Sequence, residues 1–125
     1  MGLDQYAYYV SKRAAIDDFH YDGQGRMYQD FTWRKSRFIH GWMEELFRAK
    51  GGTGDFNCQS VRLELADLDR LEQVIKQRGF KDVHGFFWGD GEYTDDDAEY
   101  DMRFVKGAKE HIRDTGGAVY YSSWW

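Results

Sequence analysis

The chain of 125 residues contains no proline and only one cysteine, Cys58. A single cysteine cannot form an intramolecular disulfide, and chains with so few cysteines are typical of a reducing compartment. No charged-then-apolar leader opens the chain. Its longest uncharged run, residues 115–125, falls far short of the roughly 20 apolar residues that a membrane span needs. These absences predict a cytoplasmic protein without a membrane partner.

An excess of basic residues is also missing. The formal net charge is -5, from 22 acidic and 17 basic residues. Seven of the acids lie between Asp90 and Asp101, where no basic residue occurs, so the rest of the chain is close to neutral. Nucleic-acid-binding domains usually carry a dominant basic patch, and we therefore do not expect nucleic acid to be the main partner. Residues 33–37 and the tyrosines near both ends of the chain keep base stacking open as an alternative.

Aromatic residues are abundant instead. Trp, Tyr and Phe make up 18% of the chain and gather in four blocks, residues 1–9, 31–42, 84–93 and 118–125. Large rings supply much of the buried area of a small domain, so these blocks predict core and interface positions. They do not by themselves indicate a reaction.

The hydrophobic pattern predicts one α+β domain over residues 1–125, with a mostly antiparallel sheet and three helices. Strands are expected at residues 3–10, 26–30, 59–65 and 118–125, and residues 84–88 are expected to form a further strand or a buried loop. Helices are expected at residues 30–50, 67–78 and 94–114. Asp30 is the predicted N-cap of the first helix, and Gly51 is predicted to end it.

The first predicted helix has an unusual second face. Trp33, His40 and Phe47 recur every seven residues opposite its apolar stripe, flanked by Arg37 and Arg48. A surface helix is normally polar on that side. Either loops of the chain itself, such as residues 11–27, cover this face, or it docks a protein partner or a second copy of the chain. These five residues are our candidate partner-binding residues.

Lys35 falls inside the apolar stripe of the same predicted helix, where a buried ammonium is costly unless it is paired. It either extends to solvent at the helix start or pairs with a carboxylate at a polar site. Arg34, Lys35, Trp88 and Asp90 are candidate residues for such a small-ligand site, with His40 as a possible neighbour.

No motif for catalysis, metal binding or cofactor binding is present. The four histidines lack the spacing that places two metal ligands on one helix face, and Asp95 stands where an EF-hand needs its glycine. The P-loop, the dinucleotide fingerprint and the GxSxG elbow are all absent from the sequence. We therefore predict no catalytic residue, no metal and no cofactor.

Four segments of the sequence, MGLDQYAY, WRKSRFIHGW, GFFWGDGEY and YYSSW, occur in this order from end to end. They resemble a family of small bacteriophage proteins that begin MGLDMYLY, carry YWRK before an IH-W helix and an FFFG loop, and end in SSW. This chain departs from that pattern at Gln5, Ala7 and Thr32, and its acidic stretch replaces a Tyr-Asp-Glu-Trp-Tyr-like run. Some members of the family are labelled as similar to phosphoglycerate kinase, but this chain has neither the length nor the nucleotide loop of that enzyme.

The resemblance implies a phage origin and a host-cytoplasm setting, and it supplies no catalytic residues. Combined with the aromatic blocks, it predicts a small accessory protein that binds a host or phage protein, for example to inhibit a host enzyme or a defence system. A small-ligand-binding protein or minor enzyme with a site near Lys35 and His40 is the alternative, and a nucleic-acid binder is the second alternative.

Overall fold

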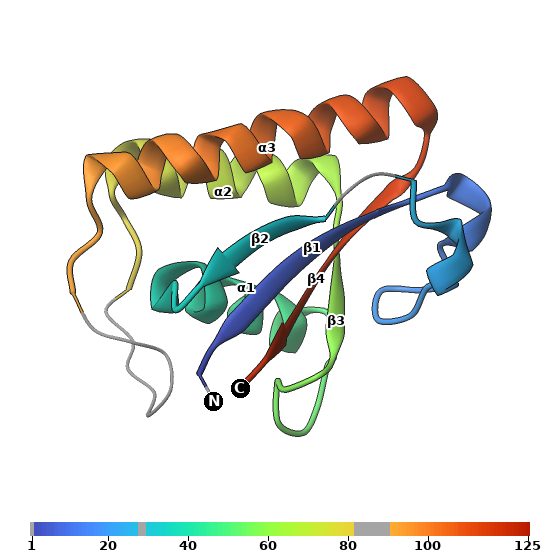
Figure 1. The fold of residues 1–125 in the computed structure, drawn as a ribbon, viewed down its shortest axis with the longest axis horizontal. Coiled ribbons are helices and arrows are strands. Elements are labelled where there is room, and N and C mark those ends of the chain that lie inside the picture. The colour runs from blue at the N-terminus through green and yellow to red at the C-terminus, as the bar shows by residue number, and fades with distance from the viewer. Residues whose placement is uncertain (1, 28–29, 82–90) are drawn as a thin grey trace.

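The computed structural model describes residues 2–27, 30–81 and 91–125 of the chain. Within them, four strands and three α-helices follow in the order β1, β2, α1, β3, α2, α3, β4 (Figure 1). Their bounds are β1 Asp4–Val10, β2 Phe31–Arg34, α1 Arg37–Ala49, β3 Ser60–Leu63, α2 Leu65–Gln77, α3 Asp95–Thr115 and β4 Ala118–Trp124. The strands form one sheet in the order β2-β1-β4-β3, and every neighbouring pair is antiparallel. The predicted α+β class with three helices is confirmed.

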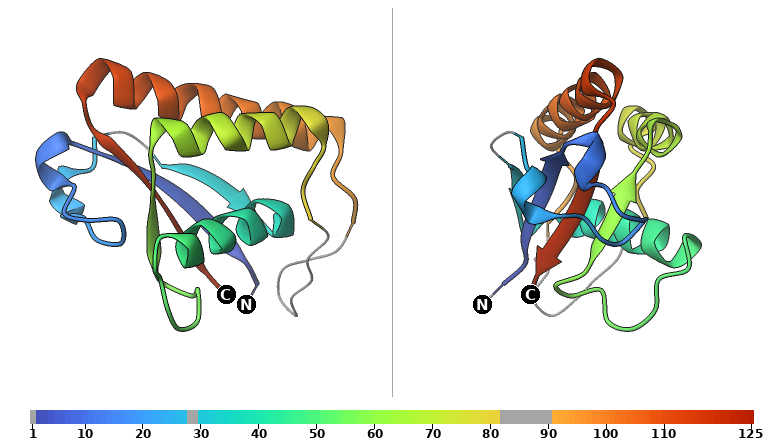
Figure 2. Two further views of the ribbon diagram at one scale, coloured as in Figure 1. Left: turned by 180° about the vertical axis from the view of Figure 1, so that it is seen from behind. Right: turned by 90° about the vertical axis from the view of Figure 1, so that its right-hand side faces the viewer.

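The main core lies between the sheet and the three helices. Alternate residues of the strands point to this side, among them Ala7, Trp33, Val61 and Tyr121, and all four are buried. They share one cluster with apolar residues of each helix, such as Met43, Leu68 and Phe104. Helices α2 and α3 lie side by side along the sheet, and α1 packs across its other end (Figure 2). All three helices therefore cover the same face.

None of the three α-helices in the described residues packs on the opposite face of the sheet. Residues 11–27 leave the end of β1 and fold over only the upper part of this face, near Val10 and Ala118. There Ala14 and Tyr21 pack with Tyr120 in a second, small cluster. Farther along this face Thr32, Arg34 and Trp124 are exposed in the described part of the chain.

The first predicted helix is wrong over its first third. Residues 31–34 form strand β2, which pairs with β1 in the register Ala7↔Phe31 to Asp4↔Arg34. Lys35 then adopts a left-handed backbone with φ 55, and Ser36, not Asp30, is the N-cap of α1. The alternation of Phe31 and Trp33 with polar residues was a strand signal, and pairing with β1 outweighs the helical spacing that continues upstream of Ser36.

The other predicted elements are found with small shifts. Helix α3 begins after Thr94, whose side chain and that of Asp97 cap it reciprocally, and it ends at Gly116 with φ 70. Helix α2 starts two residues earlier than predicted and ends at a left-handed Arg78. The second strand lies at 31–34 instead of 26–30; Arg26 makes only an isolated bridge to Val10. The predicted element at residues 84–88 lies outside the described residues.

No helix among the described residues combines the length and the apolar character that crossing a membrane requires.

Candidate functional site

The predicted partner face on the first helix does not exist as a surface. Trp33, His40 and Phe47 are at most 7% exposed, and Arg37 is also buried, so only Arg48 lies in solvent. Trp33 belongs to β2, and the rings of Phe56 and Phe19 pack on Phe47 at centroid distances of 4.7 and 5.4 Å. The chain's own loops cover this side of α1, so the hypothesis of an exposed aromatic helix face is wrong.

Only two residues of the predicted polar site, Arg34 and Lys35, lie in the described part of the chain, and the possible neighbour His40 is not beside them. Arg34 and Lys35 are exposed, and Arg34 lies 4.0 Å from a carboxylate oxygen of Asp4. His40 is fully buried, so it shares no solvent-accessible site with Lys35. Lys35 is not part of a helix, which removes the reason to expect a buried ammonium. Trp88 and Asp90 lie outside the described residues.

His40 instead belongs to a buried polar cluster under the sheet. Its Nδ1 lies 3.0 Å from the hydroxyl of Tyr121, and that hydroxyl accepts a hydrogen bond from the amide of Gln5. The Gln5 amide nitrogen also donates to the carbonyl of Ser36 at 3.0 Å, and its oxygen accepts the Ser36 N–H at 2.8 Å. Burial lowers the pKa of His40 to about 4, so its ring is neutral at neutral pH. The cluster connects β1, β4 and the start of α1, which is a structural role.

A buried carboxyl group lies near the start of α3. Asp101 is 2% exposed and accepts hydrogen bonds from Trp33 Nε1 at 2.8 Å and from the Tyr93 hydroxyl at 2.5 Å. Burial raises the pKa of Asp101 to about 6, although the two donors oppose this shift. No basic side chain is among its hydrogen-bond partners or the causes of its shift. Burial therefore disfavours the charged form of Asp101 in the folded protein.

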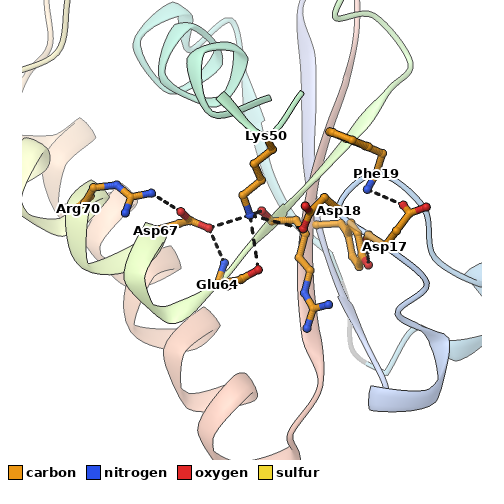
Figure 3. A network of polar contacts seen from close by, with 9 residues as sticks. Asp17, Asp18, Phe19, Lys50, Glu64, Asp67 and Arg70 are labelled. Atoms are coloured by element: carbon orange, nitrogen blue, oxygen red, sulfur yellow. Dashed lines mark hydrogen bonds and ion pairs between the residues drawn. The ribbon is translucent and has the colours of Figure 1, made fainter. Parts of the chain in front are cut away.

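A second polar network connects the end of α1, the start of α2 and the loop around Asp18 (Figure 3). Lys50, just after α1, donates to the carbonyl of Arg62 at 2.6 Å and lies 2.9 Å from the Asp67 carboxylate. Asp18 and Glu64 complete the cluster at 3.9 Å from the same ammonium. Burial raises the pKa of Asp67, but the Glu64 N–H and Lys50 outweigh it, so the pKa lies below its ordinary value. The network is paired throughout and holds α1, α2 and residue 18 in place.

No group of three His, Cys, Asp or Glu side chains that could hold a metal ion is found among residues 2–27, 30–81 and 91–125. A structural metal site contributes directly to the free energy of folding, so removing its metal lowers the thermal midpoint of unfolding. Because we predict no such site, we expect the midpoint to be the same before and after dialysis against EDTA. Differential scanning calorimetry checks this. A fall of several degrees that one divalent ion reverses would contradict the prediction of a metal-free protein.

The open sheet face is the best candidate for a functional surface. We use this name for the strand side chains on the side of the sheet away from the α-helices, which are Asp4, Tyr6, Tyr8, Thr32, Arg34, Ser60, Arg62, Ser122 and Trp124. Thr32, Arg34 and Trp124 are exposed, and the others are partly buried. In register, Arg34, Asp4 and Trp124 form one row across the sheet, and Thr32, Tyr6, Ser122 and Ser60 form the next. Trp124 is 65% exposed, which is unusual for so large an apolar side chain. Nothing in the fold requires it there.

Aromatic rings continue along this face from Trp124. The Tyr6 and Tyr8 rings are parallel to within 7° with centroids 6.0 Å apart, and Tyr21 lies 5.7 Å beyond Tyr8. The Arg26 guanidinium lies 4.5 Å from the centroid of Tyr8. Burial raises the pKa of Tyr8 to about 12, so its hydroxyl stays protonated and uncharged. The face therefore offers a row of neutral rings with arginines beside it.

The sequence predicted only part of this surface. Residues 3–10 were predicted to form a strand, and the tyrosines near both chain ends were considered as stacking groups. Trp124 was expected to be buried with Tyr120, Tyr121 and Trp125, but only the two tyrosines are fully buried. Trp125 donates through Nε1 to the carbonyl of Phe56 at 2.9 Å, whereas Trp124 points to the open side. Which strand face would stay uncovered could not be read without the positions of the helices.

Comparison with known proteins adds no relative: no family model, no curated protein and no solved structure matches this chain.

Proposed function

We propose that this protein is a small binding module of phage origin that acts in the host cytoplasm by docking a host or phage macromolecule on its open sheet face. Inhibition of a host enzyme or of a defence system is the outcome that we associate with such binding. The observation that carries the proposal is the exposure of Trp124 beside Tyr6 and Arg34, on a sheet whose other face packs against the three α-helices of the described residues.

Physical reasons favour this surface over the others. Trp, Tyr and Arg are the residue types that most often dominate binding energy at interfaces, and here all three occur together. Keeping an indole ring in water sacrifices about 2 kcal/mol or more of burial free energy, which the fold itself does not recover. The buried polar clusters around His40 and Lys50 are, by contrast, paired within the protein.

The test compares capture of binding partners by two variants. We expect Trp124→Ser combined with Arg34→Ser to abolish capture from a lysate of infected cells, because both side chains are exposed and lie in one row of the face. Ile16→Ser is the matched control: Ile16 is 66% exposed, close to the 65% of Trp124, but belongs to the segment at the far end of the sheet. Mass spectrometry of the retained macromolecules is the measurement.

The melting temperature of each variant shows whether it is folded, and both are expected to melt close to the wild type. A macromolecule retained by the wild type and by Ile16→Ser, but lost with the double variant, supports the proposal. Equal retention by all three proteins, or retention by none, contradicts it.

A further inference from the structure

The row of rings on the open sheet face lies on the two central strands. Tyr6 and Tyr8 belong to β1 and Trp124 to β4, and these strands are neighbours in the middle of the sheet. Asp4 pairs with Trp124, so Tyr6 is its diagonal neighbour on the same face. Sheets with aromatic side chains on such positions and helices behind them can stack two or three unpaired bases. The placement of the rings therefore fits a ligand made of successive flat heterocycles.

The charges on the strands are more favourable to a polyanion than the net charge of the chain. Asp4 is the only acidic residue in the four strands, and it lies 4.0 Å from Arg34. Arg62 is a second cation of the open sheet face, and Arg26, which lies over Tyr8, is ion-paired with Asp30. Asp95 and Asp96 lie in the first turn of α3, whereas Asp97 of the same turn lines a cavity together with Arg34. Interactions between exposed charges fade beyond about 10 Å in ordinary salt, so the charges close to this face, of both signs, act on a ligand here more strongly than the net charge of the whole chain.

A cavity lies at the edge of the sheet, next to the row of aromatic rings, and is large enough for a flat heterocycle. It has a volume of about 530 Å³ and is lined by Tyr6, Thr32 and Arg34 of the open sheet face, by Tyr100 of α3, and by the acidic residues Asp4, Asp97 and Asp101. This volume is within the range of small-ligand pockets. A duplex hides the faces of its bases in its own stack, so only an unpaired strand can use both the rings and the cavity.

We propose that the open sheet face binds single-stranded nucleic acid, with bases stacked on Trp124 and Tyr6 and phosphates held by Arg26, Arg34 and Arg62. This inference rests on the proposed function and names the chemical class of its partner. It also gives the aromatic exposure a physical cause, because stacking platforms must stay accessible in the free protein.

The experiment is fluorescence anisotropy with labelled oligothymidylate and oligouridylate of about 12 nucleotides, a length typical of such sites. We expect the wild type to bind at least one of them and to bind duplex DNA of the same length much more weakly. Trp124→Ala should weaken binding about tenfold or more, the usual loss for one stacking ring. Ile16→Ala, at an equally exposed position off the face, should leave binding unchanged.

The salt dependence tests the phosphate contacts separately. Three contacts predict a slope of about -2 for the logarithm of the binding constant against the logarithm of salt concentration. A fourfold rise in salt should thus weaken binding roughly 20-fold, and Arg34→Gln should reduce the slope by about 0.7.

An oligonucleotide of the same length without bases separates stacking from charge alone. Binding of this abasic strand as tightly as oligothymidylate, or equal affinity of the wild type and Trp124→Ala, would overturn the inference. Absence of binding by both single strands at low salt would overturn it too. If the lysate experiment still retains a protein through the open sheet face, and nuclease does not release it, the inference fails while the proposed function stands.

Discussion

A chain shortened to end at Tyr121 is expected to lose its cooperative unfolding transition. Strand β4 lies between β1 and β3, and the four deleted residues include the pairs Gln5↔Ser123 and Ser60↔Ser122. The carbonyl of Ser123 accepts the N–H of Cys58 at 2.8 Å. Trp125 also exchanges three hydrogen bonds with Asn57 and Phe56. The deletion would leave the edge of the core around Phe56 without its partners.

The new chain end makes this loss worse. Tyr121 is fully buried, so the truncated chain would carry a terminal carboxylate next to the core, where an unpaired charge is very costly. We expect a loss of several kcal/mol, comparable to the 5–15 kcal/mol that usually separates folded from unfolded domains. Circular dichroism during thermal unfolding measures this. The control is Trp124→Ala, which removes only an exposed ring and should melt within a few degrees of the wild type; a normal transition in the truncated chain would show that β4 is not integral to the fold.

The second large effect is expected at Asp101, as a change in how stability depends on pH. The carboxyl ionises near its ordinary pKa of 3.8 in the unfolded chain, whereas burial raises its pKa to about 6 in the folded protein. The folded state therefore binds the proton more tightly. The stability from this group is full below pH 3.8 and is lost as the pH rises through about 6. The difference in pKa corresponds to about 3 kcal/mol at neutral pH.

Asp101→Asn is therefore expected to stabilise the protein by up to about 3 kcal/mol near pH 8 and to leave it almost unchanged near pH 4, where Asp101 is already neutral in the folded state. The amide can still accept the Trp33 N–H through its oxygen. Urea denaturation at both pH values is the measurement. Asp96→Asn, at an exposed position in the first turn of α3, is the control and should be slightly destabilising at both.

The contribution of His40 to stability changes with pH in the opposite direction to that of Asp101, so removing Asp101 makes the contribution of His40 visible. Its pKa is about 4 in the folded protein against an ordinary 6.5, so the stability that it contributes is present above pH 6.5 and is lost as the pH falls towards 4. In the wild type the two groups largely cancel between these values. Removing Asp101 should expose the rise of stability with pH that His40 causes. Destabilisation of Asp101→Asn near pH 8 would instead show that the carboxylate gains more from Trp33 and Tyr93 than it loses by burial.

Local signals in the sequence were sufficient for most of the secondary structure. The helix predicted at residues 94–114 from its apolar spacing agrees almost to the residue with α3, Asp95–Thr115. The tyrosine-rich residues 3–10 and the aromatic residues 118–125 were likewise predicted as strands, and they form β1 and β4. These features depend on neighbours within a few positions, which is why they could be predicted.

The tertiary structure decided what the side chains in those elements do. Residues 31–34 have helical spacing with the residues that follow, yet they pair with β1, and this pairing moves Trp33 into the core beside Asp101. His40 and Phe47 resemble an exposed stripe in sequence, but Phe56 and Phe19, from two loops, cover them. By itself the sequence determined an α+β fold and its aromatic content. Only packing of all three helices on one face decided that Trp124 and Tyr6 remain accessible, because burial of a strand face depends on segments that are distant in the chain.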